Sequence, residues 1–514
     1  MFKKIEIMDT TLRDGEQMRN ISYSPDEKLA IAKLLLEELN ADRIEITSAR
    51  VSKGEELAVK KIVDWAKINH SIDKIEILGF VDKKESIDWI NSLDGKVVNI
   101  LAKGSKKHLD KQLKKTKEQH LEEIIETIKY AQKNDIICNL WLEDWSNGML
   151  HSPDYVYYLL DNLKNMGIKR FMLADTLGIL FPAQVEQYLK GIIKKFPGLH
   201  FDFHAHNDYG LATANTLKAV EVGVNGIHCT INGMGERAGN AALEEVVVAV
   251  KDFLDLETGI KEEHLFSASK TVEAFSGQRI ATNKPICGEN VFTQTAGIHA
   301  DGDRKGNLYT SKLLPKRFNR VRQYSLGKLS GKSNLEYNLE EFGFNLSKEQ
   351  QKLVLKKVVA LGDKKKVITS DDLPYIISDV LETPEAKIYK LTSCNILTSL
   401  STKPVAIIKL YYKNNFSNQF LELEENAQGD GGYDAFMNAM RKIAKKINFI
   451  LPELIDYITT IPPGGKTDAL VQCAITWKIK NGRHLITKGV NSDQVLAAVE
   501  ATEKMMNLLA VVKE

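Results

Sequence analysis

The stretch KIEIMDTTLRDGEQ (residues 4–17) sets the pattern that decides the fold. Its first six residues predict a short β-strand, and after a polar turn the spacing of apolar residues predicts a helix over Ser24–Asn40. Ser24 is the expected N-cap of this helix, Pro25 its first residue, and Glu27 the partner that completes a capping box. The start of the chain is therefore expected to form one strand–helix unit.

The same unit recurs through the first half of the chain. Eight strand–helix units of about 30 residues each favour an α/β fold in which a parallel sheet closes into a (β/α)8 barrel, the TIM barrel. An open doubly wound sheet is the alternative, but no GxGxxG turn follows the first strand. Further strands are expected at 42–47, 74–80, 97–102, 136–144, 170–175, 200–207 and 226–233, with helices that include 121–133 and one after Pro182.

Beyond the barrel, the character of the sequence changes twice. We expect the barrel to occupy residues 1–264 and a mainly helical linker, built of subdomains, to occupy 265–387. Over 388–514 the β-rich runs return, with helices near 433–447 and 492–508. This last region is expected to be a separate α+β domain.

Length, charge and cysteine usage exclude several classes of protein. The chain has 514 residues, too many for one ordinary domain, and 70 basic against 68 acidic residues leave a net charge of +2. No global field therefore favours a nucleic-acid or membrane partner. The five cysteines stand singly, which excludes a disulfide framework and favours a reducing, cytoplasmic location. No apolar run approaches the roughly 18 residues of a membrane span.

Polar residues gather where the predicted strands end, and in such a barrel this face carries the chemistry. His204 and His206 are two apart, so both imidazoles point to one side of a strand. Together with Asp14, brought near by closure of the barrel, and Asn240, they could bind zinc, manganese or magnesium. The alternative is that these histidines only form hydrogen bonds inside the barrel.

Two further residues at these strand ends could act on a substrate. Arg13 could polarise a carbonyl oxygen, or it could form an ordinary salt bridge at the barrel mouth. Glu143 could be a general base, or it could cap a loop. The lysine-rich segment 103–120 also holds acidic residues and no aromatic ones, so it reads as a solvated surface.

Three motifs, DTTLRDGEQ (9–17), HAHNDYGLATAN (204–215) and NGMGERAGN (232–240), resemble those of the acyl-CoA-dependent 2-oxo-acid condensing enzymes of the DRE-metal barrel superfamily. This family includes the 2-isopropylmalate, citramalate and homocitrate synthases, and the surrounding sequence looks most like the citramalate synthases. The resemblance extends through TAGIHADG (295–302), LGKLSGK (326–332) and the C-terminal domain.

The resemblance implies roles for individual residues in an acyltransferase that condenses acetyl-CoA with a 2-oxo acid. Arg13 would polarise the oxo group, Glu143 would be the acid/base and Thr176 would contact the substrate carboxylate. The linker would cover the active site of the partner subunit in a homodimer. The implied metal ligands are Asp14, His204, His206 and Asn240, and the implied catalytic residues contributed in trans are His299, Asp301 and Tyr309.

The side chains expected beside the metal bear on the choice of 2-oxo acid. Leu78, Leu101 and Trp141 are bulky and apolar. They favour pyruvate and the product (R)-citramalate, in isoleucine biosynthesis, although citramalate synthases usually have Tyr in place of Trp141. One alternative is a 2-isopropylmalate synthase of leucine biosynthesis, which takes 2-oxoisovalerate. Another is that these residues are plain barrel core. Homocitrate synthase is disfavoured, because a second substrate carboxylate would need a cation at this apolar wall.

The C-terminal domain resembles the regulatory domain of the same family, with isoleucine or leucine as the expected inhibitor. Glycine-rich loops permit close approach of a small effector to the backbone, although they could also be purely structural turns. A lyase that cleaves carbon–carbon bonds is a rival interpretation, but such relatives generally lack this domain. A sensor without catalysis is another, and it would be expected to have lost the metal ligands. The candidate regulatory residues are Gly429, Asp430, Gly431, Tyr433, Asp434, Gly464 and Gly465.

Overall fold

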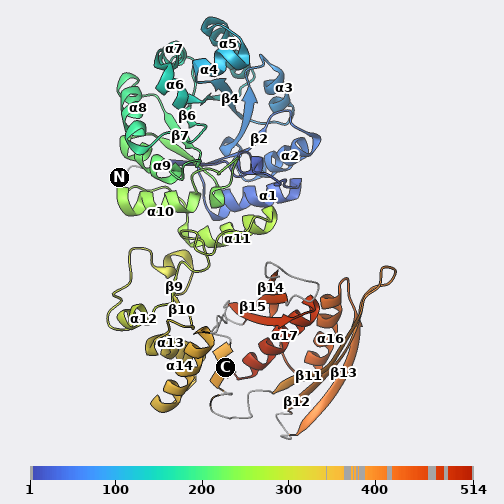
Figure 1. The fold of residues 1–514 in the computed structure, drawn as a ribbon. Coiled ribbons are helices and arrows are strands. Elements are labelled where there is room, and N and C mark those ends of the chain that lie inside the picture. Colours follow the sequence, from blue (N-terminus) through green and yellow to red (C-terminus); the bar gives the residue numbers. More distant parts are fainter. Residues whose placement is uncertain are drawn as a thin grey trace. The chain divides into compact units, whose positions relative to one another are not determined.

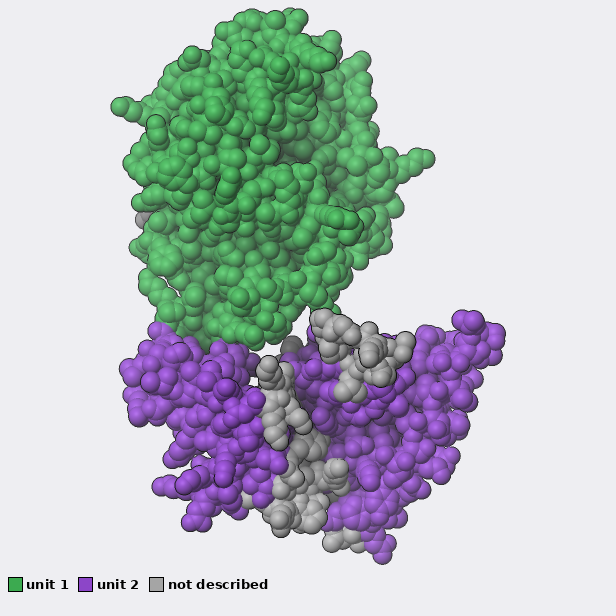
Figure 2. Space-filling model, in the orientation of Figure 1, with its two compact units in different colours: residues 1–292, 311–321 green, residues 293–310, 322–514 purple. Residues whose placement is uncertain are grey.

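The computed structural model divides the chain into two compact units (Figures 1 and 2). The first comprises residues 1–292 and 311–321, and the second comprises 293–310 and 322–514. The structure describes residues 4–342, 344–363, 372–373, 376–377, 380, 388–413, 419–460, 471–479 and 484–511.

Eight parallel strands close into a barrel in their order along the chain, because β1 pairs with β8 as well as with β2 (Figure 1). This confirms the (β/α)8 barrel, and every predicted strand overlaps an observed one. The last strand ends four residues earlier than predicted, because the chain turns into a short 3-10 helix over Ile231–Gly233. The strands are β1 (Glu6–Asp9), β2 (Arg43–Ser48), β3 (Ile75–Phe80), β4 (Val97–Lys103), β5 (Ile137–Glu143), β6 (Phe171–Asp175), β7 (Phe201–Ala205) and β8 (Gly226–Cys229).

Helices surround the strands of the barrel (Figure 1). The predicted capping box is present: Ser24 accepts a hydrogen bond from the backbone of Glu27, whose carboxylate accepts one from the backbone of Ser24. The first helix continues beyond Lys33 as a π-helical turn over Leu34–Glu38. The helices are α1 (Pro25–Lys33), α2 (Lys53–Ile68), α3 (Glu85–Ser92), α4 (Lys106–His108), α5 (Lys117–Lys133), α6 (Trp145–His151), α7 (Pro153–Leu163), α8 (Pro182–Lys195), α9 (Ala212–Val222), α10 (Leu243–Leu254) and α11 (Leu265–Ser276).

Alternate residues of each strand face opposite sides of the barrel wall. In β2, Ile44 and Ile46 join the apolar core that lies between strands and helices. Arg43 and Glu45 are equally buried but belong to the opposite, inner face. Because helices cover the outside, the polar residues of these strands point into the barrel.

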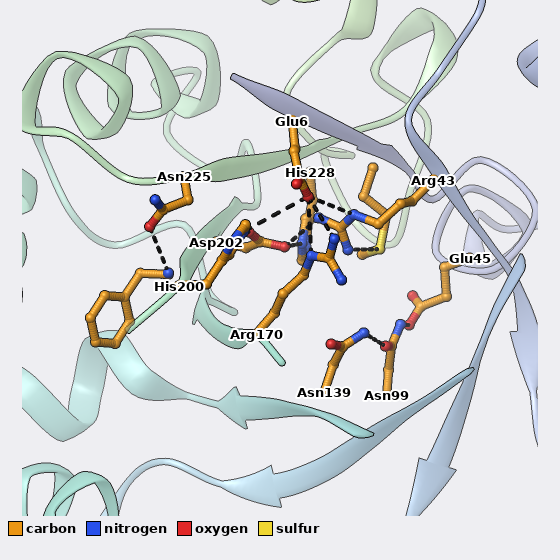
Figure 3. A network of polar contacts seen from close by, with 12 residues as sticks. Glu6, Arg43, Glu45, Asn99, Asn139, Arg170, His200, Asp202, Asn225 and His228 are labelled. Carbon is orange, nitrogen blue, oxygen red and sulfur yellow. Dashed lines mark hydrogen bonds and ion pairs between the residues drawn. The ribbon is translucent and has the colours of Figure 1, made fainter. Parts of the chain in front are cut away.

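The beginnings of the strands carry a group of charged side chains that bind one another (Figure 3). Arg43 binds Asp202 at 2.6 Å and Glu76 at 3.0 Å. Burial alone would raise the pKa of Asp202, but Arg43, His200 and His228 together outweigh burial and hold this pKa well below its usual value. We call this group the floor network, and its members are Glu6, Arg43, Glu76, Arg170, His200, Asp202 and His228.

The second compact unit begins with a small helical region. Strands β9 (Thr293–Gln294) and β10 (Gln323–Tyr324) pair in parallel beside helices α12 (Gly297–Arg304), α13 (Lys332–Phe342) and α14 (Lys348–Asp363). Helix α11, just before it in sequence, belongs to the first compact unit. The functional boundaries at residues 264 and 387 stay predictions.

The C-terminal region is the predicted α+β domain. Two three-stranded antiparallel sheets pack against helices α16 (Gly432–Lys446) and α17 (Gln494–Val511). Their common core includes Met440, Trp477 and Met506. The sheets consist of β11 (Tyr389–Leu397), β12 (Val405–Lys413) and β13 (Phe420–Gln428), and of β14 (Glu453–Thr460), β15 (Val471–Lys478) and β16 (His484–Asn491). None of the helices in the described part of the chain has the length and hydropathy of a membrane span.

Candidate metal centre

An aspartate and two histidines meet at the mouth of the barrel, where the strands end. Asp14 lies in the turn after β1, and its backbone N–H donates to the carbonyl of Thr10. His204 lies in β7 and His206 directly follows that strand. One ligand atom from each residue lies within 4.8 Å of the other two, and the three side chains are buried. The sequence prediction that Asp14, His204 and His206 come together therefore holds.

The protonation states of this cluster suit a divalent cation. Burial lowers the pKa of His204, and it lowers that of His206 to about 4, so both imidazoles are neutral near pH 7. Burial alone would raise the pKa of Asp14, but the neighbouring Arg13 and the two histidines bring it well below its usual value. The cluster thus offers one anionic oxygen and two neutral nitrogens, which are ligands for zinc or manganese.

Asn240 reaches the same place from the loop after β8. Its backbone pairs with that of His206, and its Nδ2 donates to the carbonyl of Met234 at 3.0 Å. Gly239 just before it has a φ of 84°, and a Cβ there would lie 1.9 Å from the carbonyl oxygen of Gly233. Only glycine fits position 239, which explains the last glycine of NGMGERAGN.

Two buried oxygens at this site have no hydrogen-bond partner in the described structure, namely Oδ1 of Asp14 and Oδ1 of Asn240. A buried acceptor without a partner costs free energy, of the order of 1–3 kcal/mol. A cation bound by the cluster would remove this cost. The residues present therefore fit a divalent metal.

Arg13 is fixed in place beside the cluster. Its Nε lies 2.5 Å from Glu45 of β2, and its guanidinium carbon lies 5.3 Å from the ring centre of Trp141. Burial would lower the pKa of Arg13, but Glu45 and Asp14 outweigh burial and raise it. Glu45 also accepts hydrogen bonds from Asn99 at 2.8 Å and from the indole N–H of Trp141 at 3.2 Å. Glu45 thus holds both the guanidinium of Arg13 and the indole ring of Trp141.

Glu143 and Thr176 stand at the ends of neighbouring strands. Glu143 is the last residue of β5 and forms an ion pair with Lys103, the last residue of β4. The hydroxyl of Thr176 accepts a hydrogen bond from the backbone N–H of Asp144 at 2.8 Å. The carbonyl of Thr176 accepts one from Arg237 at 2.6 Å. These bonds tie together the loops that follow β5, β6 and β8.

The three predicted wall residues form part of one apolar cluster inside the barrel. This cluster is separate from the core between strands and helices. The ring of Trp141 lies 4.9 Å from that of His204 and 4.8 Å from that of His228. Trp141 therefore lies directly beside a metal-ligand candidate, and the other members of the cluster pack with it. The members of the cluster are Met8, Leu78, Leu101, Trp141, Met172 and Ala174.

His299, Asp301 and Tyr309 belong to the second compact unit. The rings of His299 and Tyr309 lie 4.2 Å apart, and Tyr309 is 40% exposed. Asp301 instead binds Lys305, the residue that follows the same helix, at 2.6 Å. The loop that carries Tyr309 is held by Asp303, which accepts hydrogen bonds from Tyr309 N–H, Arg322 and Tyr324.

The candidate regulatory residues cluster at the start of α16. Gly431 is the N-cap of this helix, and the carboxylate of Asp434 accepts a hydrogen bond from the backbone of Asp430 at 3.0 Å. Tyr433 and Asp434 line a cavity of about 640 Å³ whose wall also includes residues 451–454. Gly464 and Gly465 lie outside the described residues.

A closed (β/α)8 barrel with an Asp–His–His cluster at its mouth defines a class of metal-dependent barrel enzymes. Residues 4–272 match the HMGL-like family, residues 286–366 the homocitrate synthase post-HMGL domain-like family, and residues 367–510 the LeuA allosteric (dimerisation) domain. The matches follow one another along nearly the whole chain.

Relatives of similar length narrow the assignment. An (R)-citramalate synthase of Methanocaldococcus jannaschii is 35% identical over 98% of this chain and 99% of its own. A putative (R)-citramalate synthase of Archaeoglobus fulgidus is 34% identical over 98% and 100%. A 2-isopropylmalate synthase of M. jannaschii is 33% identical over 99% and 96%. The chain belongs to the family of citramalate and 2-isopropylmalate synthases, which are acyltransferases of the condensing type.

Sequence reasoning missed Glu45, Lys103 and Asp303, which hold residues that it did identify. Glu45 sits in a strand whose alternating pattern gives no sign of which face is inside the barrel. Lys103 sits at the edge of a lysine-rich segment that reads as solvated. In a barrel, the ends of neighbouring strands meet at one face. The position of Lys103 at a strand end could therefore have identified it as the partner of Glu143.

Proposed function

We propose that this protein condenses acetyl-CoA with a 2-oxo acid in a metal-dependent, Claisen-type reaction, with pyruvate as the substrate and (R)-citramalate and CoA as the products. The observation that carries the proposal is the buried cluster of Asp14, His204 and His206 beside Arg13. Four buried cysteines and one half-buried one, all free, agree with a cytoplasmic enzyme.

We assign the metal to Asp14, His204, His206 and Asn240, and zinc, manganese and magnesium are the candidate ions. When bound there, the metal would act as a Lewis acid that polarises the keto group of the 2-oxo acid. Arg13 would donate hydrogen bonds to the keto oxygen and stabilise the negative charge that develops on it. The bond from Nε of Arg13 to Glu45 and the ion pair with Asp14 at 3.4 Å support this role, because they fix the guanidinium beside the metal-ligand candidates.

Glu143 is the proposed base. Its carboxylate would take a proton from the acetyl methyl group, so that a C–H bond breaks, an O–H bond forms and the electron pair is delocalised into the thioester. The resulting carbanion equivalent would attack the keto carbon, whose oxygen takes up the charge beside Arg13. Water then cleaves the thioester and releases CoA, which makes the sequence irreversible. Thr176 would hold the substrate carboxylate.

The inner apolar cluster supports pyruvate. Leu78 and Leu101 pack in one cluster with Trp141, whose ring lies beside His204, and pyruvate carries a methyl group where 2-oxoisovalerate carries an isopropyl group. Overlap with rigid side chains excludes the larger acid more strongly than the loss of a contact would. A 2-isopropylmalate synthase is the second candidate, because a relative of that name is 33% identical over 99% of this chain.

One assay tests both candidates. The rate of CoA release from acetyl-CoA is measured with pyruvate, 2-oxoisovalerate or 2-oxoglutarate, after removal of metal and after addition of zinc, manganese or magnesium. We expect activity with pyruvate only when a metal is present. Preference for 2-oxoisovalerate would support the second candidate, and release with none of the three acids would refute the proposal.

We further propose a homodimer in which the linker of one subunit, residues 265–387, completes the active site of the other through His299, Asp301 and Tyr309. The exposure of Tyr309 and its contact with His299 support this arrangement. Mixed dimers test it: His206→Ala and His299→Ala subunits, each inactive alone, should regain about a quarter to a half of wild-type activity after unfolding and refolding together. Absence of recovery would refute a site shared between subunits.

Residues 388–514 are the proposed regulatory domain, and isoleucine is the expected inhibitor, with leucine as the alternative. The cavity beside Tyr433 and Asp434 supports this proposal, because its lining combines charged side chains, including Asp434 and Arg441, with apolar ones. Either group could recognise part of a free amino acid. Unchanged activity in saturating isoleucine and in saturating leucine would overturn it.

A further inference from the structure

The last residue pair of the β4–β5 ladder joins the proposed base to a buried cation. Lys103 and Glu143 are register partners, and their side chains form an ion pair. The side chain of Lys103 is only 11% exposed. A buried ammonium needs a partner, and Glu143 is the one acid within ion-pair distance of it in the described part of the chain.

The backbone on both sides of this pair is fixed. The carbonyl of Lys103 accepts a hydrogen bond from the hydroxyl of Tyr155, which in turn contacts Nδ1 of the buried His120 at 2.7 Å. The carbonyl of Glu143 accepts one from the backbone of Gly104 at 2.6 Å. Only the two side chains are therefore free to change position.

A second cation competes for Glu143. The guanidinium carbon of Arg13 lies 5.3 Å from the ring centre of Trp141, and Glu143 is two residues further along the same face of β5. If the carboxylate moved onto Arg13, it would occupy the hydrogen-bond donors that the keto oxygen needs. The ion pair with Lys103 of the neighbouring strand β4 would oppose this movement.

We propose that Lys103 is a positioning residue for Glu143. Its ammonium holds the carboxylate away from Arg13, in a position from which the carboxylate can reach the acetyl methyl group. This inference rests on the proposed function. In the step concerned, the methyl C–H bond breaks, its electron pair passes into the thioester and the proton goes to Glu143. Lys103 neither gains nor loses a proton.

Substitution of Lys103 by Met removes the charge and keeps most of the volume, and Lys103→Arg keeps the charge. In Lys103→Met, we expect kcat to fall by about 10- to 100-fold, with the KM for the 2-oxo acid within about twofold of wild type. Lys103→Arg should recover most of the loss. The control is Lys106→Met, because Lys106 pairs with Asp110 at the surface, is 62% exposed and should be dispensable.

Two kinetic readouts separate positioning from a merely structural role. With trideuterated acetyl-CoA, the isotope effect on kcat should rise in Lys103→Met, because proton removal becomes the slow step. In a double-mutant cycle, Lys103→Met should cost little when added to Glu143→Gln, since the first residue acts through the second. Three results would overturn the proposal. They are an unchanged isotope effect, a loss of kcat in the double variant equal to the product of the two single losses, and a change confined to the KM for acetyl-CoA.

A crystal structure of Lys103→Met tests the positional claim without turnover. The Glu143 carboxylate should then lie against Arg13, and a carboxylate that keeps its wild-type position would refute the role of Lys103. Absence of CoA release from the wild-type protein would refute the proposed function instead, and the structural result would still decide the position of Glu143.

Discussion

Both ends of the barrel bury charged side chains, yet these charges are paired differently. At the floor, Arg43 meets Asp202 and Glu76, so that each charge there faces an opposite one. At the mouth, Asp14 and two neutral imidazoles converge with acceptor oxygens left unpaired. The floor also holds buried atoms without a hydrogen-bond partner, among them Oε2 of Glu76, so the mouth is distinguished by the convergence of three metal-ligand atoms and not by unpaired atoms alone. Breaking a buried ion pair destabilises a fold, whereas removing a ligand atom removes a ligand site. Substitutions at the two ends should therefore fail in different ways.

Replacement of His206 by Ala should have the largest effect. It removes a neutral nitrogen ligand, so metal content should fall and CoA release should drop by about 10³-fold or more, which corresponds to about 4 kcal/mol. Measurement of bound metal by mass spectrometry and of CoA release checks both. His151→Ala, at an exposed helix end, is the control and should match wild type. Retained turnover in His206→Ala would remove the metal assignment.

Replacement of Arg43 by Met should instead destabilise the fold. It leaves Asp202 and Glu76 buried without their common partner, and breaking such a pair costs about 3–5 kcal/mol. Urea unfolding followed by circular dichroism measures the loss, and metal bound per folded molecule should stay normal. Lys61→Met breaks the exposed pair with Asp26 and should cost less than about 1 kcal/mol. Equal losses of unfolding free energy in Arg43→Met and Lys61→Met would contradict a stabilising role for the floor network.

His120 is a buried histidine that belongs neither to the floor network nor to the metal cluster, so it tests the effect of burial alone on stability. Burial lowers its pKa to about 4. Between about pH 6.5 and pH 4, the unfolded chain therefore binds a proton that the folded protein does not, and stability falls as the pH falls through this window. The loss should reach at most about 3 kcal/mol. His120→Gln should flatten the pH dependence of unfolding measured against wild type, and identical slopes would exclude this contribution.

A substitution in the apolar wall should have the smallest effect on activity among these predictions. Leu101→Ala makes room beside the proposed substrate, so the ratio of kcat/KM for 2-oxoisovalerate to that for pyruvate should rise by about 10-fold. Leu57→Ala, on the outer helix α2 and 50% exposed, is the matched control. An unchanged ratio in Leu101→Ala would mean that this side chain is plain barrel core.

The sequence predicted the barrel well because each strand is short, apolar on its outer face and followed by a helix. The proximity of His204 and His206 could also be predicted, because residues two apart share a face of a strand. Asp14 joined them because the closure of a barrel brings the first and last strands together.

The floor network and Glu45 could not be predicted from the same pattern. In β2, the alternation of Arg43 and Glu45 with isoleucines would usually mean that the charged residues face water. Here the helices cover the other face, so the charges lie inside and need partners from distant strands. Asp202 lies 159 residues from Arg43, and no local pattern links the two.

The closure of β8 onto β1 has a consequence for the order of events in the cell. The metal-ligand candidates come from residue 14, from residues 204 and 206 and from residue 240, so they span most of the barrel sequence. A ribosome must therefore release almost the whole barrel before the proposed site is complete, and an amino-terminal fragment that stops short of β7 lacks both histidines. Metal binding at the proposed site would thus require that synthesis of the barrel is nearly complete.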